Sequence, residues 1–240
     1  MTTAPSLLDR LHVVDSPEAD VRIWCLHLDL LSSAESSALI ELLDETERAR
    51  AARFHFGRDR HRYVVARALL RGLLGAELEI SPAAISLAYG PQGKPRLAGH
   101  GALRFNLSHS AGWAVFAVTE RSELGIDLES TERLAPNDTH LASLAERILS
   151  GRELEVWRAL PEAKRHSAFL RAWTRKEAFM KTTGSGIFDG LREIEVILDA
   201  AAPQPSLLLT RSAAAEVGSW QLHDLPAPEG FLAAFAIAQA

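Results

Sequence analysis

Two acidic residues in the segment GIDLE (residues 125–129) have the spacing and setting expected of cation ligands. Ile126 and Leu128 are apolar and alternate with Asp127 and Glu129, which is the pattern of a strand with one face in the core. Residues two apart on a strand project from the same face, so the two carboxylates lie side by side. Because like charges at this separation repel, we expect the pair to share a cation or another partner.

A third carboxylate interrupts the apolar face of the predicted helix SAFLRAWTRKEAFMK (167–181). At 100° per residue, Glu177 falls next to Trp173 inside the apolar face. An isolated buried carboxylate costs several kcal/mol, so Glu177 must be paired or must coordinate a metal. Lys181, four residues on, and the adjacent Lys176 leave an ordinary helical ion pair open as the alternative.

Three oxygen ligands without histidine or cysteine favour a hard cation, above all magnesium. Such an ion, held by a few carboxylates, usually meets the phosphate groups of a substrate. A lysine beside this cluster would then neutralise phosphate oxygens. Asp127, Glu129 and Glu177 are the expected ligands, and Lys181 is the expected lysine.

The segment FNLSHS (105–110) adds groups that can bind an anion. If it is a continuous strand, Asn106, Ser108 and Ser110 share one face and His109 lies on the apolar face as a core residue. If the strand ends at Ser108, then Ser108 and His109 lie at its mouth, where both can donate hydrogen bonds to an anion. The sequence leaves both arrangements open.

Two basic segments are further candidates for phosphate binding. GKPR (93–96) places Lys94 and Arg96 in a turn fixed by glycine and proline, although a solvated loop would look the same. A second segment, 47–62, is rich in arginine, and either a solvated helix face or a phosphate ester as partner would explain it. Its arginines are Arg48, Arg50, Arg53, Arg58, Arg60 and Arg62.

The composition is that of a globular protein. The 240 residues are 47% hydrophobic and carry a net charge of −5, which disfavours binding to nucleic acid. The single cysteine, Cys25, excludes an internal disulfide and a cysteine-rich metal site, and it fits a reducing compartment. We see no signal peptide, and the apolar segment 230–240 is far shorter than the roughly 20 residues that span a bilayer. We therefore expect a cytoplasmic protein without a membrane segment.

Periodicity and capping signals predict the elements that position these residues. In the first half a strand is expected at 21–30, helices at 32–54 with a capping box of Ser32 and Glu35, and an amphipathic helix at 59–75. Asp59 is the expected N-cap of that helix and Gly75 the expected C-cap. Strands are expected at 85–89, 103–109, 113–119 and 125–129, and a loop at 89–101.

The second half repeats this order of strand, helices and strands. Its helical stretch, 139–181, is expected to break at Pro161 and to contain a capping box of Ser150 and Glu153. Four strands, at 194–198, 206–210, 219–225 and 231–238, and a loop at 182–190 complete the prediction.

The repeated order predicts an α+β fold of two similar lobes. Each lobe is expected to be a mostly antiparallel sheet packed with helices, and the lobes to be related by a pseudo-twofold axis. The similar segments GWAVFAV (112–118) and GFLAAFAI (230–237) end the two halves, so we place the lobes at 1–120 and 121–240. A parallel sheet would need strict strand–helix alternation, which is absent. We expect a monomer.

Four segments taken in order resemble the large, two-lobed (Sfp-type) 4′-phosphopantetheinyl transferases. They are GKP at 93–95, FNLSHS at 105–110, GIDLE at 125–129 and WTRKEAFMK at 173–181. The resemblance covers roughly residues 20 to 238 and implies the fold of that family. It also implies its reaction: coenzyme A binds between the lobes, and a serine of an acyl or peptidyl carrier protein attacks the β-phosphate of its pyrophosphate. The phosphopantetheine arm moves to the serine, and adenosine 3′,5′-bisphosphate leaves.

The resemblance also implies roles for individual residues. Asp127, Glu129 and Glu177 would hold Mg²⁺, and Glu177 would deprotonate the serine directly or through water. Lys181 would stabilise charge on the pyrophosphate as the bond breaks, and Ser108 and His109 would contact the coenzyme A phosphates. The remaining coenzyme A contacts would be Gly93, Lys94 and Pro95 on the adenosine side and Arg48, Arg50 and Arg62 on the 3′-phosphate.

Two other functions remain compatible with the residues alone. A magnesium-dependent phosphoesterase or nuclease also uses carboxylate clusters, but it would release a free product and need no protein acceptor. A coenzyme A-binding module would use the carboxylates for structure only.

Overall fold

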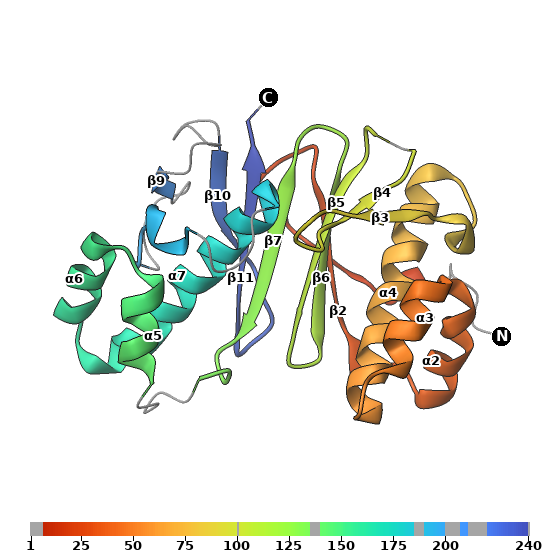
Figure 1. The fold of residues 1–240 in the computed structure, drawn as a ribbon, viewed down its shortest axis with the longest axis horizontal. Helices are drawn as coiled ribbons and strands as arrows, with labels where there is room; N and C mark the ends of the chain where they lie inside the picture. Colours follow the sequence, from red (N-terminus) through yellow and green to blue (C-terminus); the bar gives the residue numbers. More distant parts are fainter. Residues whose placement is uncertain are drawn as a thin grey trace.

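The computed structural model describes residues 7–99, 101–134, 140–184, 190–199, 207–210 and 220–239. Within these ranges the chain forms two lobes side by side, with strands in the middle of the molecule and most helices at the two ends (Figure 1). Each lobe combines an antiparallel sheet with helices, which confirms the predicted α+β class and its two lobes.

The N-terminal lobe contains a four-stranded antiparallel sheet with the strand order β1-β2-β6-β5. These strands are β1 His12–Val14, β2 Arg22–His27, β5 Arg104–Ser110 and β6 Trp113–Thr119. Its helices are η1 Leu28–Leu30, α2 Ser33–Leu39, η2 Ile40–Leu42, α3 Glu45–Ala52, α4 Gly57–Leu78 and η3 Pro82–Ala84. A separate pair joins β3 Leu87–Tyr89 to β4 Pro95–Leu97.

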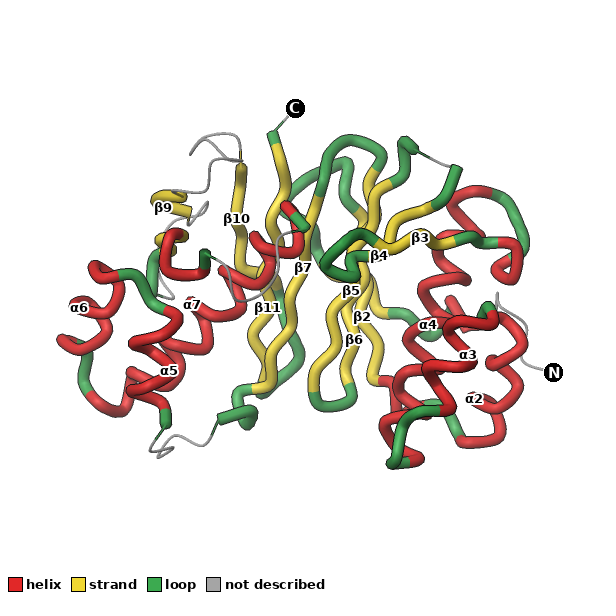
Figure 2. Tube along the Cα trace, in the orientation of Figure 1, coloured by secondary structure: helices red, strands yellow, loops and turns green. Residues whose placement is uncertain are grey.

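The C-terminal lobe contains a three-stranded antiparallel sheet with the order β10-β11-β7 (Figure 2). Its strands are β7 Leu124–Ser130, β10 Trp220–Leu225 and β11 Phe231–Ala238. Its helices are α5 Leu141–Ile148, α6 Gly151–Ala159, α7 Glu162–Thr183 and η4 Leu191–Glu193. A separate pair joins β8 Ile194–Val196 to β9 Leu207–Thr210.

The two lobes repeat one order of elements. A strand (β2 or β7) leads through short helices into a helix of 22 residues (α4 or α7), which is followed by a two-stranded pair and two further strands. The sheets repeat as well, because β2-β6-β5 has the same connectivity as β7-β11-β10. The two predicted capping boxes are present at the starts of α2 and α6.

The predicted ends of the 59–75 helix are wrong. Helix α4 starts at Gly57, after Phe56, and continues to Leu78, and Glu79 ends it in the left-handed conformation. Gly75 lies inside the helix because the chain turns back over it, and a Cβ there would lie 2.8 Å from the carbonyl oxygen of Ile80. This glycine therefore permits a close backbone approach and does not end the helix.

Other boundaries also differ from the prediction. The expected strand 21–30 turns into η1 at Leu28, and η2 interrupts the expected helices at 32–54. The expected loop 89–101 contains β4, and β1 lies in a segment for which no element was predicted. Part of the expected loop 182–190 and the first residues of the expected strands 206–210 and 219–225 lie outside the described residues.

Three clusters of buried apolar side chains hold the fold together. One packs α4 against the N-terminal sheet, and another surrounds α7 in the C-terminal lobe. The third cluster, the shared core, lies between the two sheets and joins the lobes. It consists of Val21, Ile23, Cys25, Val115, Ala117, Leu124, Ile126, Leu128, Leu225, Ala233, Phe235 and Ile237. No helix among the described residues has the length and apolar character needed to cross a membrane.

Candidate active site

Strand β7 and helix α7 bring two of the predicted carboxylates together. Gly125 allows this approach, because a Cβ at that position would lie 2.1 Å from the carbonyl oxygen of Ala178. Asp127 on β7 is 3% exposed and Glu177 on α7 is 4% exposed. Each has one buried oxygen, Oδ2 of Asp127 and Oε1 of Glu177, without a hydrogen-bond partner. Such unpartnered buried oxygens are uncommon and point to a ligand.

Burial and the negative charge of Asp127 raise the pKa of Glu177 from 4.5 to about 7. The interpretation of Glu177 as half of a helical ion pair is wrong for both lysines. Lys176 Nζ lies 2.5 Å from Glu153, and Lys181 Nζ lies 2.6 Å from Asp127. Glu177 is therefore a buried acid that changes protonation near neutral pH.

Glu129, the third predicted ligand, has partners of its own. Its Oε1 accepts a hydrogen bond from Nε1 of Trp173 at 2.8 Å and pairs with Arg133, whose guanidinium lies over the Trp173 ring. Its Oε2 accepts a hydrogen bond from Ser110 at 3.3 Å. In the part of the chain that the structure describes, no three acidic, histidine or cysteine side chains are grouped closely enough to hold one ion. In this arrangement Arg133 and Trp173 hold Glu129, so it is not grouped with Asp127 and Glu177 among the described residues, and its role as a metal ligand stays a prediction.

The polar face of β5 joins the two lobes. Strand β5 continues to Ser110, and its alternate polar residues face the open edge of β7. The Oδ1 atom of Asn106 accepts a hydrogen bond from the amide of Ile126 at 3.1 Å, and Oγ of Ser110 accepts one from the amide of Ser130 at 3.1 Å. The side chains of β5 therefore satisfy backbone amides at the edge of β7 that a neighbouring strand would otherwise satisfy.

Ser108 lies between the reactive groups of the C-terminal lobe. Its hydroxyl donates to Oδ1 of Asp127 at 2.9 Å and accepts from Nζ of Lys181 at 2.9 Å. Lys181 also donates to the carbonyl oxygen of Ile126 at 3.2 Å. Asp127, Ser108 and Lys181 thus form one hydrogen-bonded group beside Glu177.

His109 lies on the opposite face of β5 from Ser108. Its side chain is exposed in the wall of a cavity of about 400 Å³, between β5 and helices α3 and α4. The continuous strand is confirmed, with Asn106, Ser108 and Ser110 on one face and His109 on the other. The expected core position of His109 is wrong, because its ring is exposed to the cavity. Neighbouring atoms shield the ring from water, and this desolvation lowers the pKa of His109. The positive charges of Lys181 and Arg50 lower it further. The neutral ring can donate or accept a hydrogen bond within the cavity.

The structure separates the three candidate arginines. Arg50 and Arg62 line the His109 cavity, but Arg62 is held by Asp29, with Nε 2.8 Å from Oδ1. Arg48 donates to the carbonyl oxygens of Ile40 and Glu41 and does not line this cavity. Arg48 and Arg50 are about 200° apart around α3, so they point to opposite sides.

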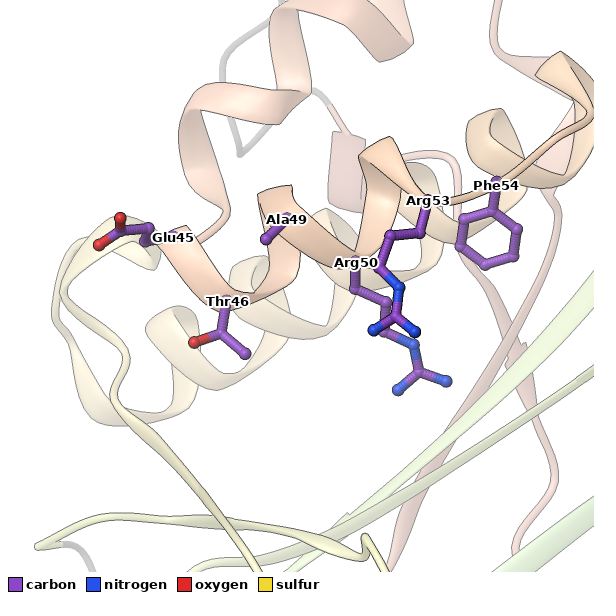
Figure 3. A pocket seen from close by; sticks show the side chains of 6 residues that line it. All are labelled: Glu45, Thr46, Ala49, Arg50, Arg53 and Phe54. Atoms are coloured by element: carbon purple, nitrogen blue, oxygen red, sulfur yellow. The ribbon is translucent and has the colours of Figure 1, made fainter.

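Arg53 is a candidate that the sequence analysis did not select. Arg50 and Arg53 lie on the same side of α3, and both line a neighbouring hollow of about 840 Å³ (Figure 3). Neither arginine has an ion pair among the described residues. By contrast, Arg67, which lines the His109 cavity, is paired with Glu47. The spacing of three residues on a predicted helix was the signal that could have identified the pair.

Lys94 forms hydrogen bonds within the protein. Its Nζ donates to Glu123 at 2.8 Å, to the carbonyl oxygen of Thr182 at 3.0 Å and to that of Leu124 at 3.3 Å. Burial lowers the pKa of this lysine. Lys94 and Pro95 line a separate cavity of about 200 Å³, and neither lines the His109 cavity. Lys94 therefore ties the β3–β4 turn to β7 and to the end of α7.

Comparisons with known proteins agree with this arrangement. A family model described as "4'-phosphopantetheinyl transferase, N-terminal" matches residues 31–121, and the "4'-phosphopantetheinyl transferase superfamily" model matches residues 123–238. The 4′-phosphopantetheinyl transferase HetI of Nostoc sp. is 38% identical over 222 residues, which cover 91% of this chain and 88% of HetI.

Two Bacillus relatives are also similar. The 4′-phosphopantetheinyl transferase psf-1 of Bacillus pumilus is 31% identical over 175 residues, 71% of this chain and 72% of that protein. The 4′-phosphopantetheinyl transferase Sfp of Bacillus subtilis is 25% identical over 168 residues, 70% of this chain and 72% of Sfp. The resemblance found in the sequence is therefore confirmed, and the chain belongs to the Sfp-type 4′-phosphopantetheinyl transferases, which transfer the 4′-phosphopantetheine arm of coenzyme A to carrier proteins.

Proposed function

We propose that Asp127 and Glu177 are the centre of a magnesium-dependent transfer to a serine hydroxyl of an apo acyl or peptidyl carrier protein. The observation that carries this proposal is the pair of unpartnered, buried carboxylate oxygens on β7 and α7. Two such oxygens held together cost stability unless an ion or another ligand compensates them.

The residues at this position fit a magnesium ion. The available donors are carboxylate and hydroxyl oxygens, which Mg²⁺ prefers, and Asp127 and Glu177 each have an oxygen to offer. Glu129 is proposed as the third ligand, and it must first exchange its contact with Arg133 for the ion. When bound, the ion would supply positive charge that neutralises the pyrophosphate of coenzyme A.

Individual side chains have separate roles in the proposed reaction. Glu177 takes the proton of the attacking serine, directly or through water. The serine oxygen bonds to the β-phosphorus, and the bond from that phosphorus to the bridging oxygen breaks. Lys181 stabilises the negative charge that collects on the leaving phosphate, and Ser108 and His109 donate hydrogen bonds to the phosphates.

The His109 cavity and the adjoining hollow are the proposed position of the coenzyme A nucleotide. Arg50 is the favoured partner of the 3′-phosphate, since it lines both spaces and has no ion pair among the described residues. Arg62 contributes a second guanidinium whose charge Asp29 partly offsets. Arg48 would need to release two carbonyl oxygens to take part.

Three further assignments remain proposals. Gly93, Lys94 and Pro95 would shape the adenosine side of the site through the β3–β4 turn. The lobes would divide at residues 120 and 121, within the connection between β6 and β7. The protein would act as a monomer in the cytoplasm, where its single cysteine stays reduced.

Intact-mass analysis of an apo carrier protein tests the proposal. After incubation with the protein, coenzyme A and Mg²⁺, the carrier should gain the mass of one phosphopantetheine group, and EDTA should abolish the gain. A full rate in EDTA would refute the role of the metal. Hydrolysis of coenzyme A without modification of the carrier would instead indicate a phosphoesterase, and binding without reaction would indicate a coenzyme A-binding module.

A further inference from the structure

Three consecutive charged residues are buried at the centre of α7. Arg175 and Lys176 are fully buried, and Glu177 is 4% exposed. Arg175 forms two hydrogen bonds of 2.8 Å with Asp224 on β10 and another with the carbonyl oxygen of Ile197. Two of the three charges are therefore satisfied within the protein, whereas Glu177 keeps an oxygen without a partner.

Lys176 binds one acceptor with each of its three N–H groups. They are the carbonyl oxygen of Ile148 at 2.9 Å, the carbonyl oxygen of Leu191 at 2.9 Å and Oε2 of Glu153 at 2.5 Å. These acceptors belong to the end of α5, to η4 and to the first turn of α6. Oε1 of Glu153 also accepts a hydrogen bond from the amide of Val196 on β8 at 2.7 Å. The ammonium group thus connects α7 directly to α5, α6 and η4, and through Glu153 to β8.

This anchor lies on the side of α7 away from the site. Helices α5 and α6 lie on one side of α7, and β7 and β11 lie on the other (Figure 1). The position of α7 relative to β7, which carries Asp127, therefore depends on contacts on both sides. Because Glu177 is the residue next to Lys176, a small rotation of the helix about its axis would move its carboxylate away from Asp127.

The N-terminal lobe contains the same device without a catalytic neighbour. Arg71 lies 14 residues after Gly57, the first residue of α4, and Lys176 lies 14 residues after Glu162, the first residue of α7. Nε of Arg71 binds Glu47 at 2.6 Å.

The partners of the two cations correspond as well. Glu47 closes the capping box of α3, as Glu153 closes that of α6. Arg71 also donates to the carbonyl oxygens of Pro82 and Ile85 around η3, as Lys176 donates to that of Leu191 in η4. In α4 the residue that follows the cation is Gly72. The N-terminal cluster is larger, because Arg71 also binds Asp44 and Glu47 also binds Arg67. It nevertheless provides a comparison for the buried pair of α7.

We infer that Lys176 and Glu153 are positioning residues that hold Glu177 against Asp127 during the transfer. The inference rests on the proposed role of Glu177. The corresponding pair, Arg71 and Glu47, fixes α3, which carries Arg50, and so affects the binding of coenzyme A. The two pairs should accordingly differ in which kinetic constant they control, although both stabilise the fold.

The test compares two charge-neutral double variants, Lys176→Met with Glu153→Gln and Arg71→Met with Glu47→Gln. Neutralising both partners leaves no unpaired charge at the C-terminal pair. In the N-terminal variant Arg67 loses Glu47 and Asp44 loses Arg71, so a larger loss of stability is expected there. Steady-state transfer to an apo carrier protein is measured, with rates corrected for the folded fraction from urea unfolding. We expect the C-terminal variant to lose kcat by about tenfold or more, with KM for coenzyme A within about twofold of wild type. The N-terminal variant should raise KM for coenzyme A several-fold and keep kcat within about twofold.

Two single variants keep the inference testable if a double variant fails to fold. Lys176→Arg, which installs the cation used in α4, should retain most of kcat, and Glu153→Gln alone should lower kcat to an intermediate value. A wild-type kcat in the folded fraction of Glu153→Gln, or equal losses of kcat in the two lobes, would overturn the positioning role. Glu177→Gln is measured in parallel. If that variant keeps the wild-type kcat, the proposed function of Glu177 has failed; if it loses kcat while the Lys176–Glu153 variants do not, only the positioning inference has failed.

Discussion

Replacing Glu177 by glutamine should stabilise the metal-free protein, and the gain should grow with pH. Burial and Asp127 raise the pKa of Glu177 from 4.5 to about 7. Between these two values the folded protein retains a proton that the unfolded chain has released, so wild-type stability falls as the pH rises through this window. Below pH 4.5 both states are protonated, and no difference between wild type and variant arises from this ionisation.

The size of the effect follows from the shift. A change from 4.5 to about 7 corresponds to about 3 kcal/mol once both states are ionised. At pH 5 only about 1 kcal/mol of it is expressed, and at pH 8 nearly all of it is. The advantage of Glu177→Gln over wild type should therefore grow by about 2 kcal/mol from pH 5 to pH 8, which corresponds to roughly 4–8 °C in Tm for a chain of this size.

Urea unfolding in EDTA at the two pH values measures this difference. Glu162→Gln is the matched control, because it makes the same change at an exposed position in the first turn of α7. It should shift stability by no more than about 0.5 kcal/mol at either pH. Saturating Mg²⁺ at pH 8 should stabilise the wild type and have less effect on Glu177→Gln. An equal gain for Glu177→Gln at pH 5 and pH 8 would refute the assignment of a raised pKa to this residue.

Three further outcomes are expected. Asp127→Ala and Glu177→Ala should each lower kcat by roughly 10² or more, because each removes a ligand of the proposed ion; steady-state transfer in which both variants keep kcat would contradict the site. Arg50→Ala should raise KM for coenzyme A by about tenfold but not KM for dephospho-coenzyme A, while Arg48→Ala should leave both unchanged; equal effects of Arg50→Ala on both donors would remove Arg50 from the 3′-phosphate. Gly125→Ala should destabilise the protein by more than about 2 kcal/mol in urea unfolding, because the new methyl group would overlap the backbone of α7; a stability equal to wild type would show that β7 can move away without loss.

The sequence was most informative where chemistry depends on local spacing. Alternation in the strand placed Asp127 on the correct element, and the helical wheel identified Glu177 as an acid inside an apolar face. The distant partners of charged groups were not predictable from local patterns. Glu153 is 23 residues from Lys176, and the Thr182 carbonyl is 88 residues from Lys94. Arg62 looked available for phosphate because its partner, Asp29, is 33 residues away in the chain.

Errors at element ends had a similar cause. Gly75 looked like a helix end because glycine is common there, yet its lack of a side chain serves a contact with Ile80 that forms only after the chain turns. His109 was assigned to the core or to a strand end, because strand periodicity cannot show that a cavity opens beside the end of β5. The contacts of Glu129 with Arg133 and Trp173 likewise depend on how the loop after β7 meets α7.

The shared core between the two sheets bears on how such a protein can originate. Its residues come from both lobes and contact each other across the division. Each lobe alone would therefore expose an apolar sheet face to solvent. A half-length ancestor with one lobe would have exposed this apolar sheet face, and pairing with a second copy of itself is the simplest way to cover it. Joining two copies in one gene would then have made the association independent of concentration. It would also have freed the two copies to diverge, so that glycine follows the buried cation in one lobe and Glu177 follows it in the other.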